Sequence, residues 1–284
     1  MSESEWQVAR RRKGQTRKFK SHVPLSSTSV QEDQLDVEKV VRRIRTTVTE
    51  LRCEEFWHKW KDELLMASTA SASAEKDVTE EHLKNTGDQL ECVCYGLGSF
   101  SSCTAARYQL AMLLLLLEVL QVSLRDCLVY DPIFSSGEQD VLRELGMTVL
   151  TENEEGKRLV TKPTLFYLMH CGKALYNNLL WKNWSLRGLY QLVIIGNSFN
   201  GMRERTVERV FKQEYSYISK AVDLCEEKML PCPSHMIDVF SDTAVIAFPP
   251  HILHKVPQTN WAESPEPEYR DRQDLEIILK ETQS

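Results

Sequence analysis

The chain has 284 residues, of which 42% are hydrophobic and 27% are charged, and its formal net charge is −6. This length suits one large domain with appendages or two modest domains, and the composition is ordinary for a globular protein. A negative overall charge argues against a general nucleic-acid-binding protein. The chain also opens without an apolar signal segment, so we expect its eight cysteines to be reduced and mostly buried. We expect a cytoplasmic protein, with the nucleus as a further compartment.

Residues 7–20 are half Lys and Arg and contain no acidic residue. Such a block repels itself, so we predict that residues 1–32 form a disordered basic tail and linker. This tail is either a nuclear-import signal with weak nucleic-acid contact or merely a solvated extension. Apolar residues at helical spacing then predict a helical extension and connector over 33–77. The extension is either one helix or two helices separated near Cys53, and we expect it to pack on the sheet.

Strand and helix patterns alternate through residues 78–256, with near-continuous apolar strands. The predicted strands are 91–95, 126–130, 147–150, 164–169, 189–195 and 243–248, and the predicted helices are 103–121, 138–145, 173–183 and 203–229. This alternation predicts an α/β domain with a Rossmann-like, mostly parallel sheet and helices on both faces. We expect four side chains to be almost fully buried: Leu115, Val129, Ile194 and Phe211.

Two further segments bear on this domain organisation. The longest apolar run, Leu110 to Leu117, is too short to span a bilayer, which needs about 20 residues, so we predict a core helix and no membrane span. Residues 257–284 are rich in Pro and acidic side chains, and we predict a flexible C-terminal tail with one short docking element near 275–278.

Four short segments at the ends of predicted strands occur in a characteristic order. They are CYGLGSF at 94–100, VYDP at 129–132, FYLMHC at 166–171 and IGNSF at 195–199. In this order and spacing the chain resembles the SRR (Sensitivity to Red light Reduced) family, in its animal branch. The resemblance implies a regulatory role rather than a reaction: plant members are associated with red-light signalling and circadian-clock function. Animal members are associated with clock-gene expression and haem biosynthesis.

The candidate binding residues all follow predicted strands. In an open parallel sheet, ligands bind outside the carboxyl ends of the strands, so these residues are expected to converge. The candidates are Gly96, Gly98, Ser99, Asp131, His170 and Asn197. The glycines belong to a GxGxxS variant of the dinucleotide fingerprint, in which backbone N–H groups would bind phosphate or carboxylate. The alternative for this glycine segment is a plain β–α turn. Asp131 stands where Rossmann proteins place a ribose-binding acid, and the alternative is an N-cap or turn aspartate before Pro132.

No complete catalytic set is identifiable. His170 and Cys171 are neighbours on a strand, where successive side chains point to opposite faces, and no orienting acid accompanies them. We expect His170 to contact a ligand rather than to act as a base. Cys92 and Cys94 lack a second metal-binding pair, so no metal site is predicted. Cys232, followed by Pro233, is a candidate haem ligand through its thiolate.

Three functional hypotheses remain open. The leading one is a regulatory protein, linked to circadian rhythm and haem biosynthesis, that binds a small ligand or an unidentified protein partner at the carboxyl edge of the sheet. The second is a methyltransferase or oxidoreductase that uses Gly96, Gly98 and Asp131 for its cofactor. The third is a scaffold without a ligand. The cofactor is not identified by the sequence, with haem and a nucleotide-like molecule as the candidates.

Overall fold

The computed structural model describes residues 35–74, 90–261, 265–269 and 277–279. The predicted basic tail and linker at 1–32 lies outside these residues. In the part of the chain that the structure describes, no helix is both long enough and apolar enough to cross a membrane.

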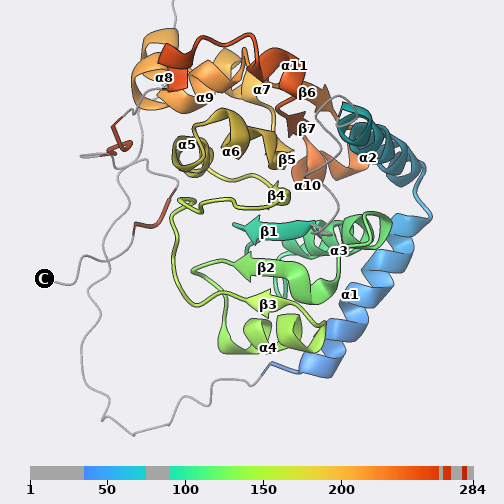
Figure 1. The fold of residues 1–284 in the computed structure, drawn as a ribbon. Coiled ribbons are helices and arrows are strands. Elements are labelled where there is room, and N and C mark those ends of the chain that lie inside the picture. The colour runs from blue at the N-terminus through green and yellow to red at the C-terminus, as the bar shows by residue number, and fades with distance from the viewer. Residues whose placement is uncertain (1–34, 75–89, 262–264, 270–276, 280–284) are drawn as a thin grey trace, which may run out of the picture. The chain divides into compact units, whose positions relative to one another are not determined.

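A seven-stranded sheet forms the centre of the described chain (Figure 1). Its strands are β1 (Glu91–Tyr95), β2 (Cys127–Tyr130), β3 (Thr148–Val149), β4 (Thr164–Leu168), β5 (Leu192–Asn197), β6 (Glu226–Met229) and β7 (Thr243–Ala247). The order across the sheet is β3-β2-β1-β4-β5-β7-β6. The first five strands are parallel, whereas β7 runs antiparallel to both of its neighbours. The prediction of an α/β fold with a mostly parallel sheet is therefore confirmed.

Helices cover both faces of the sheet, as predicted. The first face carries α1 (Val37–Arg52), α2 (Glu55–Ala74), α3 (Thr104–Val119), α4 (Ser136–Glu144) and α10 (Ile237–Phe240). The second face carries α5 (Lys173–Lys182), α6 (Leu186–Tyr190), α7 (Phe199–Glu204), α8 (Glu208–Glu214), α9 (Ser216–Ala221) and α11 (Pro250–Leu253). Short 3-10 helices lie at Leu124–Asp126, Ser234–Met236 and Gln258–Trp261.

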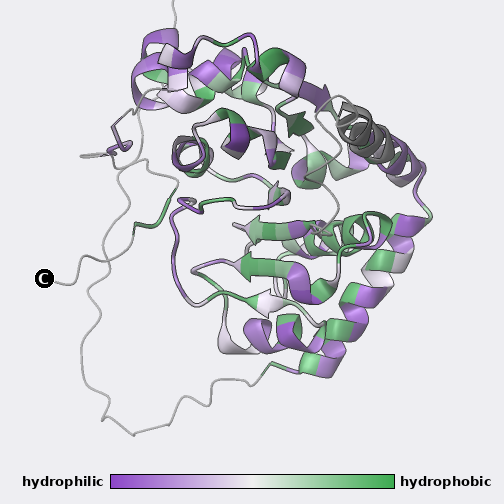
Figure 2. Ribbon diagram, viewed as in Figure 1, coloured by the Kyte–Doolittle hydropathy of each residue, from purple (hydrophilic) through white to green (hydrophobic). Residues whose placement is uncertain are grey.

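The strands are apolar on both faces because each face has its own core. Along β1, Cys92 and Cys94 face the first core, whereas Val93 and Tyr95 face the second. Burial on both sides explains the near-continuous apolar strands in the sequence, which Figure 2 shows for β1 and β2. The four side chains expected to be buried, Leu115, Val129, Ile194 and Phe211, have exposed fractions of 0–1%.

The N-terminal extension forms two helices that break at Cys53, as predicted. Asp36 caps α1 by accepting a hydrogen bond from the N–H of Lys39 at 3.0 Å. On α2, the buried Trp60 donates its indole N–H to the Pro231 carbonyl at 2.8 Å, which joins the extension to the sheet domain. The helix continues to Ala74, through part of the stretch expected to be a connector, because its Ala-rich composition favours helix.

The predicted helix over 203–229 is wrong. The segment instead contains the end of α7, the helices α8 and α9, and the edge strand β6. Tyr215, which separates α8 from α9, has φ −118° and ψ 47°, outside the helical region. β6 was missed because its sequence, EEKM, is polar and mostly exposed, so it carries no apolar strand signal.

The cysteines follow the expected burial only in part. All eight are free thiols; Cys92, Cys94 and Cys127 are buried, whereas Cys53 and Cys103 are exposed. The prediction of buried thiols holds for the strand cysteines and is wrong for the two in helix-flanking turns.

Candidate functional site

The loop after β1 requires glycine at two positions. Gly96 and Gly98 have φ +66° and +80°, in the left-handed region that favours glycine. A Cβ on Gly96 would also lie 2.6 Å from the Cys171 Sγ, so this glycine lets the ends of β1 and β4 approach each other. A Cβ on Gly98 would meet only the Ala106 Cβ, at an ordinary 3.5 Å.

Asp131 joins the loop after β1 to the loop after β2. Its Oδ2 accepts a hydrogen bond from the Gly98 N–H at 2.7 Å, and its Oδ1 accepts one from the Ile133 N–H at 3.0 Å. The second bond makes an aspartate turn of the kind weighed against the ribose-binding role. Asp131 therefore stabilises the loop itself, and it does so with both carboxylate oxygens.

A second carboxylate, Glu138, accepts from two further donors of the glycine loop. Glu138 is 1% exposed and accepts hydrogen bonds from the Ser99 hydroxyl at 2.8 Å and from the Ser101 N–H at 3.0 Å. It also completes the capping box of α4 with Ser135. Burial raises the pKa of Glu138, but the hydrogen bonds from Ser101, Ser99 and Ser135 together lower it below its ordinary value. Glu138 was not among the predicted site residues, although the motif S-x-x-E at 135–138 is a capping-box signal.

These two carboxylates decide what the glycine loop can bind. In a dinucleotide site, the N–H groups of this loop point at a phosphate. Here the N–H groups of Gly98 and Ser101 are bonded to protein carboxylates, whose negative charge repels a phosphate. The loop geometry resembles the fingerprint, but two of its backbone donors, the N–H groups of Gly98 and Ser101, are already bonded within the chain.

His170 and Cys171 have separate partners. His170 has φ +54°, and its Nε2 lies 3.1 Å from the Val239 carbonyl, to which it can only donate. The Cys171 thiol donates to the Tyr95 carbonyl at 3.3 Å, and burial raises the pKa of this thiol to about 12. A thiol with such a pKa is protonated at neutral pH, so Cys171 is not an activated nucleophile.

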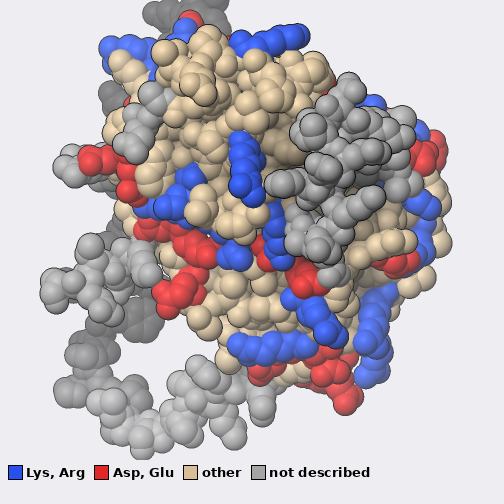
Figure 3. Space-filling model, viewed as in Figure 1, with Lys and Arg blue, Asp and Glu red and all other residues tan. Residues whose placement is uncertain are grey.

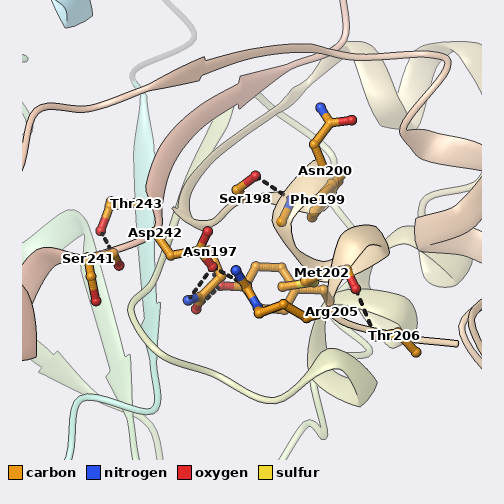
Figure 4. Close-up of polar contacts among 12 residues, drawn as sticks. Asn197, Ser198, Phe199, Asn200, Met202, Arg205, Thr206, Ser241, Asp242 and Thr243 are labelled. Atoms are coloured by element: carbon orange, nitrogen blue, oxygen red, sulfur yellow. Dashed lines mark hydrogen bonds and ion pairs between the residues drawn. The ribbon is translucent and has the colours of Figure 1, made fainter.

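Asn197 belongs to a different cluster, at the junction of β5 and β7 (Figure 4). Its side-chain amide lies 3.4 Å from an oxygen of Asp242, which forms an ion pair with Arg205. Its backbone N–H donates to the buried Tyr176 hydroxyl at 2.8 Å. On β6, Glu227 accepts hydrogen bonds from the Ser198 hydroxyl and the first N–H groups of α7. Here too, a carboxylate of the chain occupies the start of a helix.

A cavity of about 440 Å³ lies outside the carboxyl ends of β1, β2 and β4, and we refer to it as the edge cavity. Its walls include Gly96, Asp131, His170 and Cys171 but not Gly98, Ser99 or Asn197. The structure thus brings three of the six predicted residues, Gly96, Asp131 and His170, together around one space.

The edge cavity has further walls, formed by residues that were not among the predicted site residues. The segment 153–156 supplies Glu154, whose carboxylate accepts a hydrogen bond from the Tyr95 hydroxyl, and Glu155. Near the C-terminus, Ile277 and Ile278 close one side, and the Asn153 amide donates to the Ile278 carbonyl at 2.7 Å. Among the described residues that line the cavity, three are carboxylates and none is Lys or Arg. Two of these carboxylates, Glu154 and Glu155, form ion pairs with Arg158 and Lys157 outside the lining.

Cys232, the candidate haem ligand, lies partly buried in the segment before the Ser234–Met236 helix. Its Sγ donates to the Met236 carbonyl at 3.5 Å, and burial raises the pKa of this thiol. No described group of three or more His, Cys, Asp or Glu side chains could hold a metal ion.

The surface in view gives no support for a broad nucleic-acid interface. Figure 3 shows Lys and Arg side chains interleaved with Asp and Glu, without one continuous field of positive charge. The predicted basic segment at 7–20 lies outside the described residues.

Comparison with known proteins identifies the family. A family model described as the SRR1 domain matches residues 70–247. The chain belongs to the SRR1 domain family. It is 45% identical to the mouse (Mus musculus) "SRR1-like protein" over 209 residues, 68% of this chain and 84% of that protein. It is 29% identical to the Drosophila melanogaster "SRR1-like protein" over 257 residues, 89% of this chain and 85% of that protein.

The plant relative covers less of both chains. The Arabidopsis thaliana "Protein SENSITIVITY TO RED LIGHT REDUCED 1" is 38% identical over 117 residues, which are 41% of this chain and 42% of that protein. No solved structure matches this chain. The SRR1 domain match ends where β7 ends, so it includes all seven strands of the described sheet and excludes α1 and the C-terminal residues that close the edge cavity.

Proposed function

We propose that this SRR1-domain protein is a regulatory protein, linked to circadian rhythm and to the regulation of haem biosynthesis, that acts by binding a small ligand or a partner segment in the edge cavity. The links to the clock and to haem biosynthesis rest on the family resemblance. The binding mechanism rests on one observation: a cavity of about 440 Å³ at the carboxyl edge, where open α/β sheets hold their ligands.

The chemistry around the edge cavity favours binding over catalysis. The thiol of Cys171 is protonated at neutral pH, and the imidazole of His170 donates to a backbone carbonyl. Both oxygens of Asp131 accept backbone hydrogen bonds. Each candidate for acid–base or nucleophilic work is thus already engaged in holding the loops together.

A charge introduced into the edge cavity tests this proposal. Ile133 lines the cavity and is 56% exposed, so Ile133→Lys changes the cavity with little effect on folding. The matched control is Ile237→Lys, at an isoleucine that is 53% exposed and outside the cavity lining. The measurement is the melting temperature with S-adenosylmethionine, NAD(P) and haem as probes, since a ligand that binds the folded state raises it.

Two results distinguish the hypotheses. We expect at least one probe to raise the melting temperature of the wild type and of Ile237→Lys but not of Ile133→Lys. If no probe stabilises the wild type, or if Ile133→Lys responds like the control, the edge cavity is not a ligand site for these classes and the scaffold hypothesis is favoured.

A second candidate function is methyl transfer, and the strand order favours it. An order of 3-2-1-4-5-7-6, with the seventh strand antiparallel, is the arrangement of Rossmann-like methyltransferases; this is an analogy of fold and not of chemistry. The carboxylates at the glycine loop disfavour the pyrophosphate of NAD(P) but not the sulfonium cation of S-adenosylmethionine. Stabilisation by S-adenosylmethionine without stabilisation by NAD(P) would support this candidate over an oxidoreductase.

A further inference from the structure

A second pocket lies at the opposite edge of the sheet. It has a volume of about 670 Å³, within the range of small-molecule sites. Its walls are the segment before β4, the end of α5, the helix α6 and Gln191, which precedes β5. We call it the amino-edge pocket because it adjoins the amino ends of β4 and β5, whereas the edge cavity lies at the carboxyl ends.

Aromatic side chains dominate the amino-edge pocket. It contains Trp181, Trp184 and Trp261, which are three of the six tryptophans in the chain, together with Tyr217. The Trp184 ring lies 6.0 Å from the Trp261 ring and 5.1 Å from the Tyr217 ring, centroid to centroid. The three indoles are only partly buried, which leaves aromatic surface facing the pocket.

Positive charge accompanies these rings. Lys182 and Arg187 line the pocket, and no described lining residue is acidic. The Lys182 Nζ lies 5.4 Å from the centroid of the Trp181 ring, and the Nζ of the neighbouring Lys220 lies 5.8 Å from that of Trp184. A ligand ring that packs on an indole would therefore place a substituent within reach of an ammonium group.

This combination selects one class of ligand. Aromatic pockets that hold cations, such as methylated lysine, exclude cationic side chains from their walls, whereas this one contains two. An anion without an aromatic ring could not stack on the indoles. Stacking of a nucleobase on an aromatic side chain contributes about 1–3 kcal/mol, and Lys and Arg form charge-assisted hydrogen bonds with phosphate. We propose that the amino-edge pocket binds a nucleoside phosphate, with the base on the tryptophans and the phosphate on Lys182 and Arg187.

The carboxyl edge of the sheet is less suited to a nucleotide than the amino-edge pocket. Rossmann-like folds hold nucleotides at the carboxyl edge, where Asp131 and Glu138 here occupy the loop donors. The amino-edge pocket presents the opposite charge. The two sites are separate, so this proposal does not depend on the function proposed for the edge cavity.

Tryptophan fluorescence of the full-length protein provides the test. The probes are AMP, GMP, CMP and UMP, with the four parent nucleosides and inorganic phosphate as comparison arms. We expect at least one monophosphate to quench the tryptophan emission saturably. Its parent nucleoside should bind at least about 10-fold more weakly, because it lacks the charged phosphate, and inorganic phosphate alone should cause no quenching. The charge-reversal variants are Lys182→Glu and Arg187→Glu, both at exposed positions.

Matched variants complete the design. Arg209→Glu reverses an exposed charge on α8, outside the pocket lining, and should bind like the wild type. Ile133→Lys alters only the edge cavity and should also bind normally, which separates this proposal from the previous one. The proposal is overturned if none of the four monophosphates binds, whether or not a neutral proline-rich peptide binds instead. It is also overturned if the double variant Lys182→Glu, Arg187→Glu, in which both positive charges are reversed, binds the monophosphates like the wild type.

Discussion

The Asp131 carboxylate accepts a hydrogen bond from the Gly98 backbone N–H at 2.7 Å, across two different strand-to-helix loops. The same carboxylate accepts a second bond from Ile133. The acid expected to bind a ribose and the glycine expected to bind a phosphate are thus partners of each other. That relationship holds the two loops together without a ligand.

Replacing Asp131 with Asn should destabilise the fold. The substitution keeps the shape but turns one acceptor oxygen into an NH₂ donor, which then faces a backbone N–H. We expect a loss of about 1–3 kcal/mol in the free energy of unfolding, measured with urea. The control is Asp140→Asn, at a carboxylate of α4 that is paired with Arg143 at the surface, where the loss should stay below about 0.5 kcal/mol. Equal losses in the two variants would contradict the role given to Asp131.

Glu138→Gln should reveal a contribution to stability that depends on pH. A carboxyl whose pKa is lower in the folded protein stabilises the fold above its unfolded value, near 4.5, and loses that contribution as the pH falls through the folded value. We expect Glu138→Gln to cost about 1.5–3 kcal/mol at neutral pH, because several hydrogen bonds lose a charged acceptor.

The difference between wild type and Glu138→Gln should then shrink as the pH is lowered from about 5 to about 3. Urea unfolding across this range gives the measurement. Glu204→Gln, at an exposed position near the end of α7, serves as the control and should show no such trend. A difference that stays constant with pH would mean that the charge of Glu138 does not contribute.

Gly96 and Cys171 should be energetically coupled. Gly96→Ala places a Cβ 2.6 Å from the Cys171 Sγ, whereas the Cys171 Cβ is 4.0 Å away. Cys171→Ala removes that sulfur, so the double variant should be more stable than the sum of the single effects predicts, by about 0.5–3 kcal/mol. Gly98→Ala isolates the cost of positive φ without a clash, and it should destabilise less than Gly96→Ala. Strict additivity of Gly96→Ala and Cys171→Ala would contradict the close approach.

Cys171 should resist alkylation. With a pKa of about 12, only about one thiol in 10⁴ is ionised at pH 8, and the thiolate is the reactive form. Brief treatment with iodoacetamide, followed by peptide mass spectrometry, should label the exposed Cys53 and Cys103 and leave Cys171 unmodified. Rapid labelling of Cys171 in the folded protein would restore it as a candidate nucleophile.

Tyr269 should anchor the C-terminal segment. Its hydroxyl lies 3.0 Å from the Asn177 amide nitrogen, 3.0 Å from the Asn178 amide oxygen and 3.2 Å from the Ala174 carbonyl, and both asparagines are fully buried. Tyr269→Phe removes these bonds and should cost about 1–3 kcal/mol in urea unfolding. Tyr108→Phe, which removes one hydrogen bond to Glu50 at the surface, is the control and should cost less. A Tyr269→Phe protein as stable as the wild type would indicate a loose segment.

The sequence was informative where burial imposes a pattern. β1, β4 and α3 carry continuous apolar runs, so their positions were predicted to within one or two residues. The reversed direction of β7 was not predictable, because apolar periodicity is the same for parallel and antiparallel strands. The tail anchor at Tyr269 gave no signal, since a single aromatic residue among Pro and Glu has no periodicity.

The candidate site, like the fold, was predictable from the sequence only in part. The convergence of Gly96, Asp131 and His170 on one cavity follows from the rule that loops meet at the carboxyl edge. Asn197 also ends a strand, but the antiparallel β7 lies beside it and engages it through Asp242. Which donors remain free for a ligand depends on long-range partners such as Glu138, and sequence spacing does not give those.

The position of β7 between β5 and β6 has a consequence for the order in which the nascent chain assembles. β6 precedes β7 in sequence, yet β6 pairs only with β7 among the described strands. Until residues 243–247 have been synthesised and are free to fold, β6 has no described strand with which to pair. β7 is the last described strand along the chain, so a chain that ends before residue 243 leaves β5 without its antiparallel neighbour and β6 without a strand partner.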